Sequence, residues 1–161
     1  MQTKHSADAV MSGFLGYTVR QFMTHPVMTV TRRTTMRELE GLFEEYDFNA
    51  FPVVENGKVF GAISKFDFLR AFAFTTGQVV PHYNQLMSLC AGDVMSEAVV
   101  HVDPTSPLTR VLQLMVNLRI RSFPVMSANG YLEGIISRED LMRALKEATQ
   151  ESRETKPELN V

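Results

Sequence analysis

The stretch Gly61-Ala62-Ile63-Ser64-Lys65-Phe66-Asp67 recurs at an offset of 73 as Gly134-Ile135-Ile136-Ser137-Arg138-Glu139-Asp140. Upstream of each copy stands the tripeptide Phe-Pro-Val, at 51–53 and 123–125, here at an offset of 72. The extra residue falls beside an Asn-Gly pair, where a hairpin loop tolerates an insertion. The chain therefore holds two copies of one unit, too few for an extended repeat array.

Each copy is predicted to fold as strand, helix, hairpin and helix. In the first copy the β-branched run 27–30 precedes a capping box at Thr35 and Glu38, which marks a helix start. In the second copy Ser106 is expected to cap a helix whose first residue is Pro107. The Asn-Gly pairs are typical of type I′ turns, so both copies should build the same hairpin before their last helix. Apolar residues at helical spacing are expected to face the core: Met36, Leu39, Phe43, Tyr46, Leu108, Val111, Met115 and Leu118.

The chain divides on this basis into five segments. Residues 1–17 form an N-terminal extension, 18–75 the first repeat, 76–92 an inter-repeat segment, 93–147 the second repeat and 148–161 a tail. The inter-repeat segment is compatible with a longer preceding helix, an extra helical turn or a mobile flap, and the sequence does not choose. The tail mixes charged residues and proline with almost no apolar content, so it is predicted to be disordered.

Composition excludes several classes of function. At 161 residues, with 45% apolar and 21% charged residues, the chain suits one domain or two small ones with a sizeable core. Its formal charge of −2 provides no broad basic field, which argues against nucleic acid or an anionic membrane as the main partner. Cys90 is the single cysteine, so no internal disulfide is possible, and the scattered histidines suggest no metal site. No run approaches a membrane span and the N-terminus makes a poor signal peptide, so a cytoplasmic location is expected.

The repeated pattern Gly-x-Ile-Ser-x-x-Asp stands where a strand leads into a helix. Helix amides and the positive end of the helix dipole at such a junction favour an anion, to which Ser64 and Ser137 would add hydroxyl donors. Lys65 and Arg138 would supply a cation next to them. The two aspartates would accept hydrogen bonds from vicinal hydroxyls, as an acidic residue does for ribose elsewhere. The alternative is a plain capping box, which the local sequence by itself favours.

The whole constellation resembles the CBS domain, the cystathionine β-synthase type, and two copies in tandem resemble a Bateman module. The resemblance runs from about Thr18 to Glu147, and the start Asp93 to Met95 is also similar to the family's opening. It implies an α+β fold of two tandem β-α-β-β-α units packed about a pseudo-twofold axis. It also implies clefts between the copies that take adenosine-containing ligands, and assembly into a homodimer.

The resemblance further implies roles for particular residues. Asp67 and Asp140 would hold ribose hydroxyls, while the serines and the adjacent cations, Lys65 and Arg138, would meet phosphate. The base would lie against the end of each first strand, close to the Phe-Pro-Val tripeptides, where backbone groups would read the adenine edge. The residues implied in base contact are Thr29, Val30, His101, Val102, Pro52, Val53, Pro124, Val125, Ile63 and Ile136.

The two clefts are not expected to be equal. Arg119 and Arg121 of the second copy correspond to Asp47 and Asn49 of the first, so phosphate should prefer the second cleft. Arg121 is the better candidate for a phosphate contact, because neighbouring alternate positions rarely point the same way. The ordinary alternative is that both arginines are solvated ends of a helix.

Three classes of function remain to be separated. The first is a sensor module, needing no cofactor, that changes conformation or stability on binding AMP, ADP, ATP or S-adenosylmethionine and regulates an unidentified enzyme or transporter. The second is a CBS pair that binds no ligand and acts as a dimerising scaffold. The third, a nucleotide-processing enzyme, needs an activated nucleophile, an acid-base pair or a metal site, and the sequence offers none.

Overall fold

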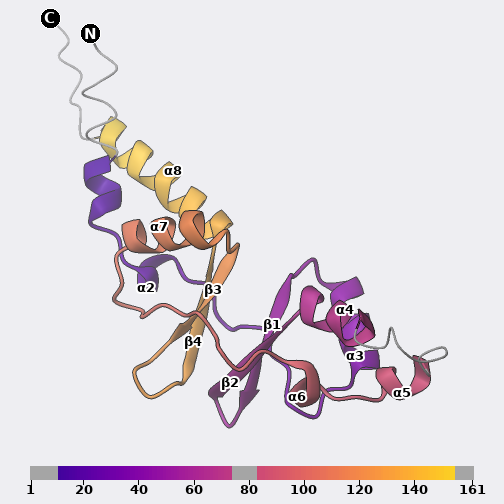
Figure 1. Ribbon diagram of the computed structural model, residues 1–161. Coiled ribbons are helices and arrows are strands. Elements are labelled where there is room, and N and C mark those ends of the chain that lie inside the picture. Colours follow the sequence, from indigo (N-terminus) through magenta and orange to yellow (C-terminus); the bar gives the residue numbers. More distant parts are fainter. Residues whose placement is uncertain (1–10, 74–82, 155–161) are drawn as a thin grey trace, which may run out of the picture. The chain divides into compact units, whose positions relative to one another are not determined.

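The computed structural model describes residues 11–73 and 83–154, which form two compact units that exchange chain segments. Of the described residues, unit 1 contains those up to Val27 together with most of the second copy, and unit 2 contains those from Met28 to Val100 with the hairpin tip Gly130–Leu132. In Figure 1 the indigo start of the chain lies beside the orange and yellow elements of the second half. The compact units therefore do not coincide with the repeats that the sequence suggests.

Unit 2 is an antiparallel hairpin covered by helices. Strand β1 (Ala50–Glu55) pairs with β2 (Lys58–Ser64) through a turn in which Asn56 and Gly57 have φ of 50° and 80°, as a type I′ turn requires. Side chains of both strands meet the helices in a core that includes Phe51, Val53 and Ile63. The helices of this unit are α3 (Met36–Glu45), α4 (Lys65–Ala73), α5 (Tyr83–Met87) and α6 (Ala91–Val94).

Unit 1 repeats this design with its own core, which includes the fully buried Phe14, Phe123 and Ile136. Its second hairpin pairs β3 (Ser122–Met126) with β4 (Leu132–Ser137), and its helices are α2 (Val19–Phe22), α7 (Leu108–Leu118) and α8 (Arg138–Glu154). In Figure 1 α7 and α8 lie next to each other above β3, and α2 lies close by. The α+β class and the paired hairpins that the sequence predicts are thus confirmed.

Several local predictions are wrong, for physical reasons. The strand expected over 27–30 is reduced to one parallel bridge between Val30 and Val53. The cap of α7 is Pro107 rather than Ser106, without a side-chain hydrogen bond, whereas the capping box of Thr35 and Glu38 at α3 is present. The second hairpin is not identical to the first, because the inserted residue lengthens its loop and only Gly130 adopts a positive φ.

The predicted tail and inter-repeat segment also need correction. Helix α8 continues to Glu154, because Ala148 is buried in the core of unit 1 and extends the apolar face beyond the expected end of the repeat. Disorder over 148–154 was therefore the wrong prediction, and residues 155–161 lie outside the described part. Of the inter-repeat segment, 83–87 forms the extra helical turn α5, while 76–82 lies outside the described residues.

The repeated glycine is what allows the exchanged segments to dock. Thr24 and Ile135 exchange two backbone hydrogen bonds of 2.8 and 3.0 Å in unit 1, and Ser96 and Ala62 exchange two of 3.0 and 2.9 Å in unit 2. A Cβ added at Gly61 would lie 2.7 Å from the carbonyl oxygen of Ser96, which is backbone and cannot turn away. Glycine at this position of the repeat therefore marks a close approach of two chain segments.

We predict that Gly61→Ala lowers the free energy of unfolding by about 1–3 kcal/mol, because the new methyl group forces the two segments apart. Gly41→Ala is the matched control, since nothing lies within 4 Å of its added Cβ. In the interior of helix α3 that change should raise stability by about 0.5–1 kcal/mol. Urea unfolding of both variants measures the contrast, and equal effects would refute the close-approach argument.

Candidate functional site

The junction between β4 and α8 holds Asp140 in a dense set of donors. Its Oδ2 accepts hydrogen bonds from the backbone nitrogen and the hydroxyl of Ser137, at 2.8 and 2.9 Å. Its Oδ1 accepts from Arg143 Nη2 at 2.9 Å and from the hydroxyl of Thr24 at 3.3 Å. The residue is only 3% exposed, so these contacts take the place of water around a buried charge.

The junction between β2 and α4 repeats this arrangement around Asp67. Its Oδ2 accepts from the nitrogen and hydroxyl of Ser64 at 2.9 and 2.6 Å. Its Oδ1 accepts from Arg70 Nη2 at 2.9 Å and from the Ser96 hydroxyl at 3.0 Å. An ionised carboxylate offers about four acceptor positions, so each aspartate is already saturated by protein donors.

The capping box expected as the alternative to a ligand site is present at both junctions. Ser64 and Ser137 each accept the backbone N–H of the aspartate three residues on, while the aspartate accepts their own N–H. Lys65 and Arg138 donate their backbone N–H to the carbonyl oxygens of Asn49 and Arg121. The amides of the first and third residues of both helices are thus bonded within the protein, which reduces the number of backbone donors for a phosphate.

Positive charge at the two junctions is unequal, as the sequence predicts. Arg138 and Arg121 are both exposed, and the backbone bond between them holds their Cα atoms at one end of α8. In unit 2, Lys65 instead forms an exposed ion pair of 3.8 Å with Asp47. Among the described residues no ion pair is recorded for Arg121 or Arg138, so the junction in unit 1 has the larger uncompensated positive charge.

Most residues implied in base contact turn their side chains into the hydrophobic cores. The buried set is Val30, Val53, Ile63, Val102, Val125 and Ile136, joined by Pro52, which is also buried. The nitrogen and carbonyl oxygen of Val102 bond to Pro124 and Met126, and those of Val30 bond to Pro52 and Val54. Thr29 and Pro124 are half-buried and His101 is exposed, so these three offer the accessible side chains.

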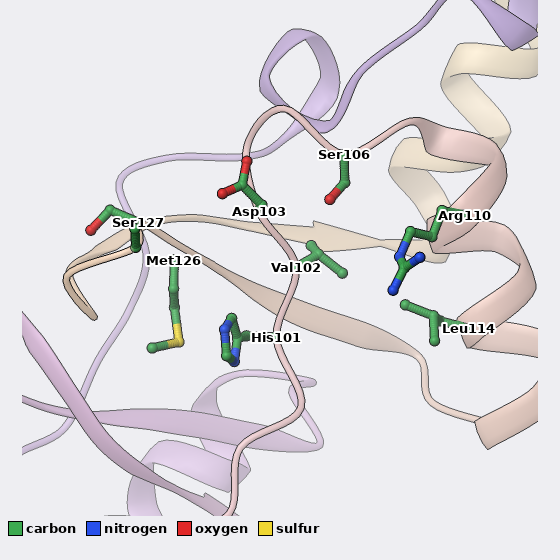
Figure 2. Close-up of a pocket in the computed structure, with 9 residues that line it drawn as sticks. His101, Val102, Asp103, Ser106, Arg110, Leu114, Met126 and Ser127 are labelled. Atoms are coloured by element: carbon green, nitrogen blue, oxygen red, sulfur yellow. The ribbon is translucent and has the colours of Figure 1, made fainter.

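Unit 1 also contains a hollow of about 270 Å³ where the loop after His101 passes the end of β3 (Figure 2). Arg110 and Leu114 reach it from α7, while His101 and Asp103 come from the loop. Hydrogen bonds from the hydroxyl and amide of Thr105 lower the pKa of Asp103, so a carboxylate and the guanidinium of Arg110 both line the hollow. Of the predicted site residues, His101 and Val102 line the hollow, whereas Asp140 does not.

Two pairs of residues that contact the aspartates were not predicted from the sequence. Thr24 and Ser96 are repeat equivalents at an offset of 72, and Arg70 and Arg143 are equivalents at an offset of 73. Arg143 does more than its counterpart, because its Nη2 also donates to the carbonyl oxygen of Phe22 at 2.7 Å. The repeat alignment was a usable signal for both pairs, since polar residues recur at matching positions without an evident local reason.

The two matched hairpins and strand-to-helix junctions are shared with a known protein family. The model of the CBS domain matches residues 19–74 and 91–147, so the chain belongs to the CBS domain family. The chain is 31% identical over 135 residues to the CBS domain-containing protein YhcV of Bacillus subtilis, covering 83% of this chain and 88% of that protein. The structure of CBSX2 in complex with AMP superimposes with a TM-score of 0.70 at 25% identity, covering 82% of this chain and 98% of the other.

Relatives of the chain include much longer proteins. It is 28% identical over 137 residues to the A-adding tRNA nucleotidyltransferase of Geobacter sulfurreducens, a match covering 85% of this chain but only 14% of that enzyme. Another curated relative is spanned to 45% of its length. Within 11–73 and 83–154, no helix is long and apolar enough to cross a membrane, and no cluster of side chains is suited to a metal ion.

We predict that Ser137→Ala lowers the free energy of unfolding by about 1 kcal/mol, because it removes the hydroxyl from the cap of α8. Ser137→Thr should recover most of this loss, since it restores a hydroxyl at the same position. Urea unfolding without ligand is the measurement. Unchanged stability in Ser137→Ala would mean that the hydroxyl contributes nothing to the cap.

Proposed function

We propose that the protein is a regulatory module that binds an adenosine-containing ligand, with AMP as the first candidate, at the junction of β4 and α8. Its membership of the CBS family and its likeness to CBSX2 in complex with AMP support this. The observation that carries the proposal is the nearly buried Asp140 carboxylate, which already accepts a hydroxyl hydrogen bond from Thr24. A hydroxyl of the ligand donates to the carboxylate in place of the Thr24 hydroxyl, so one hydrogen bond is exchanged for another of the same kind.

Exchange of hydroxyls explains how a saturated carboxylate binds ribose. The bond from Thr24 to Asp140 is long, at 3.3 Å, and Thr24 lies in an exposed residue position from which its hydroxyl can turn to water. Its loss costs little because an intramolecular hydrogen bond contributes only about 1 kcal/mol net. In unit 2 the equivalent bond from Ser96 to Asp67 is shorter, at 3.0 Å, so exchange there is harder.

Arg138 and Arg121 are the proposed phosphate contacts, since the amides of Arg138 and Asp140 at the start of α8 are already bonded within the protein. A guanidinium binds phosphate through two parallel hydrogen bonds, which suits two exposed arginines for which the described part of the chain records no ion pair. The base then packs against the accessible side chains His101 and Pro124. ADP, ATP and S-adenosylmethionine are the further candidates, and they differ in the charge that they bring to these arginines.

Regulation follows from population shift and needs no catalysis by this chain. A ligand that binds one arrangement of the chain more tightly raises the population of that arrangement, which a separate enzyme or transporter then recognises. The match to a short portion of a tRNA nucleotidyltransferase supports a role as an accessory to a larger activity.

We further propose that the protein acts as a homodimer. The second candidate function is that of a dimerising scaffold that binds no ligand. The hydrogen bonds that both aspartates already make within the protein favour it.

Thermal unfolding with AMP, ADP, ATP and S-adenosylmethionine in separate titrations tests the function. A ligand at 100 times its Kd should raise the free energy of unfolding by about 2.7 kcal/mol. Asp140→Asn should weaken AMP binding roughly ten- to hundredfold, because a charged acceptor is lost. Asp67→Asn is the matched control with a smaller expected effect. Absence of a shift with every adenosine compound would favour the scaffold.

We predict that Arg121→Asn, which copies Asn49 of the first repeat, weakens AMP binding while leaving adenosine binding within about twofold. The reason is that the Arg121 guanidinium contacts only the phosphate and no part of the adenosine. Arg119→Asn serves as the control, since its residue ends α7 in a left-handed conformation with φ of 56° that asparagine tolerates. Isothermal titration with both ligands measures the difference, and an equal loss for adenosine would remove Arg121 from the phosphate site.

A further inference from the structure

The hollow in unit 1 has a lining of mixed chemistry that the proposed function leaves largely unused (Figure 2). Its apolar part includes Val102, Leu114 and Met126, and its charged part includes Asp103 and Arg110. Small-molecule sites typically combine an apolar lining with a few polar groups that fix the orientation of the ligand. Sites for drug-sized ligands start at about 300 Å³. At about 270 Å³ this hollow therefore suits a smaller molecule.

Arg110 carries a positive charge at a position where helix α7 does not favour one. It is the third residue of the helix, in the first turn, where the helix dipole favours acidic side chains. Its counterpart in the first repeat, Glu38, follows this preference and accepts the backbone N–H of Thr35 in the capping box of α3. Within 11–73 and 83–154, no hydrogen bond or ion pair is recorded for the Arg110 guanidinium. The stability of α7 therefore does not explain this arginine.

Asp103 brings a carboxylate to the same hollow, and one of its two oxygens is available. Its Oδ1 accepts hydrogen bonds from the backbone N–H of Thr105, at 2.7 Å, and from the Thr105 hydroxyl. For Oδ2 the described part of the chain records no hydrogen bond. The bonds from Thr105, and to a smaller extent the charges of Arg20 and His101, lower the pKa of Asp103, so the carboxylate is ionised at neutral pH.

The equivalent positions of the first repeat hold charges that neutralise each other. Arg32 and Glu55, whose counterparts in the second repeat are Pro104 and Ser127, form an ion pair of 3.8 Å in unit 2. Glu55 also accepts the backbone N–H of Arg32 at 3.1 Å. The two opposite charges that line the hollow of unit 1 are different, because no ion pair between them is recorded among the described residues. Both charges are therefore open to an external partner.

We infer that this hollow binds a free α-amino acid with an aliphatic side chain, and the inference does not rest on the proposed function. The guanidinium of Arg110 binds the α-carboxylate through two parallel hydrogen bonds. Oδ2 of Asp103 accepts a hydrogen bond from the α-ammonium group. Leu114 and Met126 contact the aliphatic side chain, which is thereby removed from water. A simple acid or amine satisfies only one of the two charges, and a phosphate is repelled by Asp103.

Titration of the full chain with L-leucine, followed through its backbone amide NMR signals, tests the inference. Saturable shifts are expected around the hollow, at residues 101–106, 110–114 and 126–128. Two analogues test the charges, because 4-methylpentanoate lacks the ammonium group and 3-methylbutylamine lacks the carboxylate. Each should bind at least roughly tenfold more weakly than L-leucine. Equal binding of either analogue would overturn the inference, as would the lack of a saturable response to L-leucine, L-isoleucine, L-valine and L-methionine at millimolar concentration.

Two variants assign the charges to their partners. Arg110→Gln should weaken L-leucine binding at least roughly tenfold while leaving 3-methylbutylamine binding unchanged. Asp103→Asn keeps an acceptor for Thr105, so it should weaken L-leucine binding to a similar extent while leaving 4-methylpentanoate binding unchanged. Glu38→Gln is the matched control, since it places glutamine at the equivalent position of unit 2 and should not alter L-leucine binding.

Unfolding without ligand separates recognition from a structural role of Arg110. Arg110→Gln should unfold at the same or a higher urea concentration than the wild-type protein, because it removes a cation from the first turn of α7. A lower urea midpoint together with unchanged L-leucine binding would show that the arginine serves the fold, and it would overturn the inference.

AMP titrations of the same proteins separate this inference from the adenosine proposal. Asp140 does not line the hollow, so Asp140→Asn should leave L-leucine binding within about twofold. Arg110→Gln should leave AMP binding within about twofold for the same reason. His101 stays unchanged in these variants, because it lines the hollow and is also proposed to contact the base. Loss of AMP binding in Arg110→Gln, without any response to L-leucine, would assign the hollow to the nucleotide and overturn the inference.

Discussion

Two short antiparallel contacts hold the start of each repeat on the hairpin of the other repeat. Thr24 bonds to Ile135 and Ser96 bonds to Ala62, each through a pair of backbone hydrogen bonds. Both contacts require glycine in the receiving strand, since a Cβ at Gly61 or Gly134 would lie 3.0 Å or less from a backbone oxygen. The exchanged segments then complete each hydrophobic core, as Phe14 does in unit 1 and Ala91 in unit 2.

The same contacts bring a hydroxyl to each buried aspartate. Thr24 and Ser96 supply the fourth hydrogen bond to Asp140 and Asp67, so the same two residues serve the candidate ligand site through their hydroxyls and the docking of the exchanged segments through their backbone. Arg143 strengthens this link in unit 1, because it bonds both to Asp140 and to the carbonyl oxygen of Phe22. A ligand that competes for Asp140 therefore acts on a group that also helps to hold the chain start in place.

Local patterns in the sequence were sufficient for the hairpins, the α3 capping box and the Ser-x-x-Asp junctions, because those features depend on residues a few positions apart. The exchange of segments was not predictable in this way, since the backbone contacts of Thr24 and Ser96 are made across long sequence separations, and the repeated glycines do not tell which segment approaches them. The extent of α8 was missed because Ala148, a small residue in a charged stretch, continues the buried face. The contacts with an adenine base stay a prediction. Because the valines face the hydrophobic cores, only a few side chains are accessible for such contacts.

The exchange also constrains how such a chain can change over time. A gene cut between the repeats would encode two halves, each lacking the edge and the core side chains that the other half supplies. Either half expressed alone should therefore expose apolar side chains that the other half covers in the intact chain.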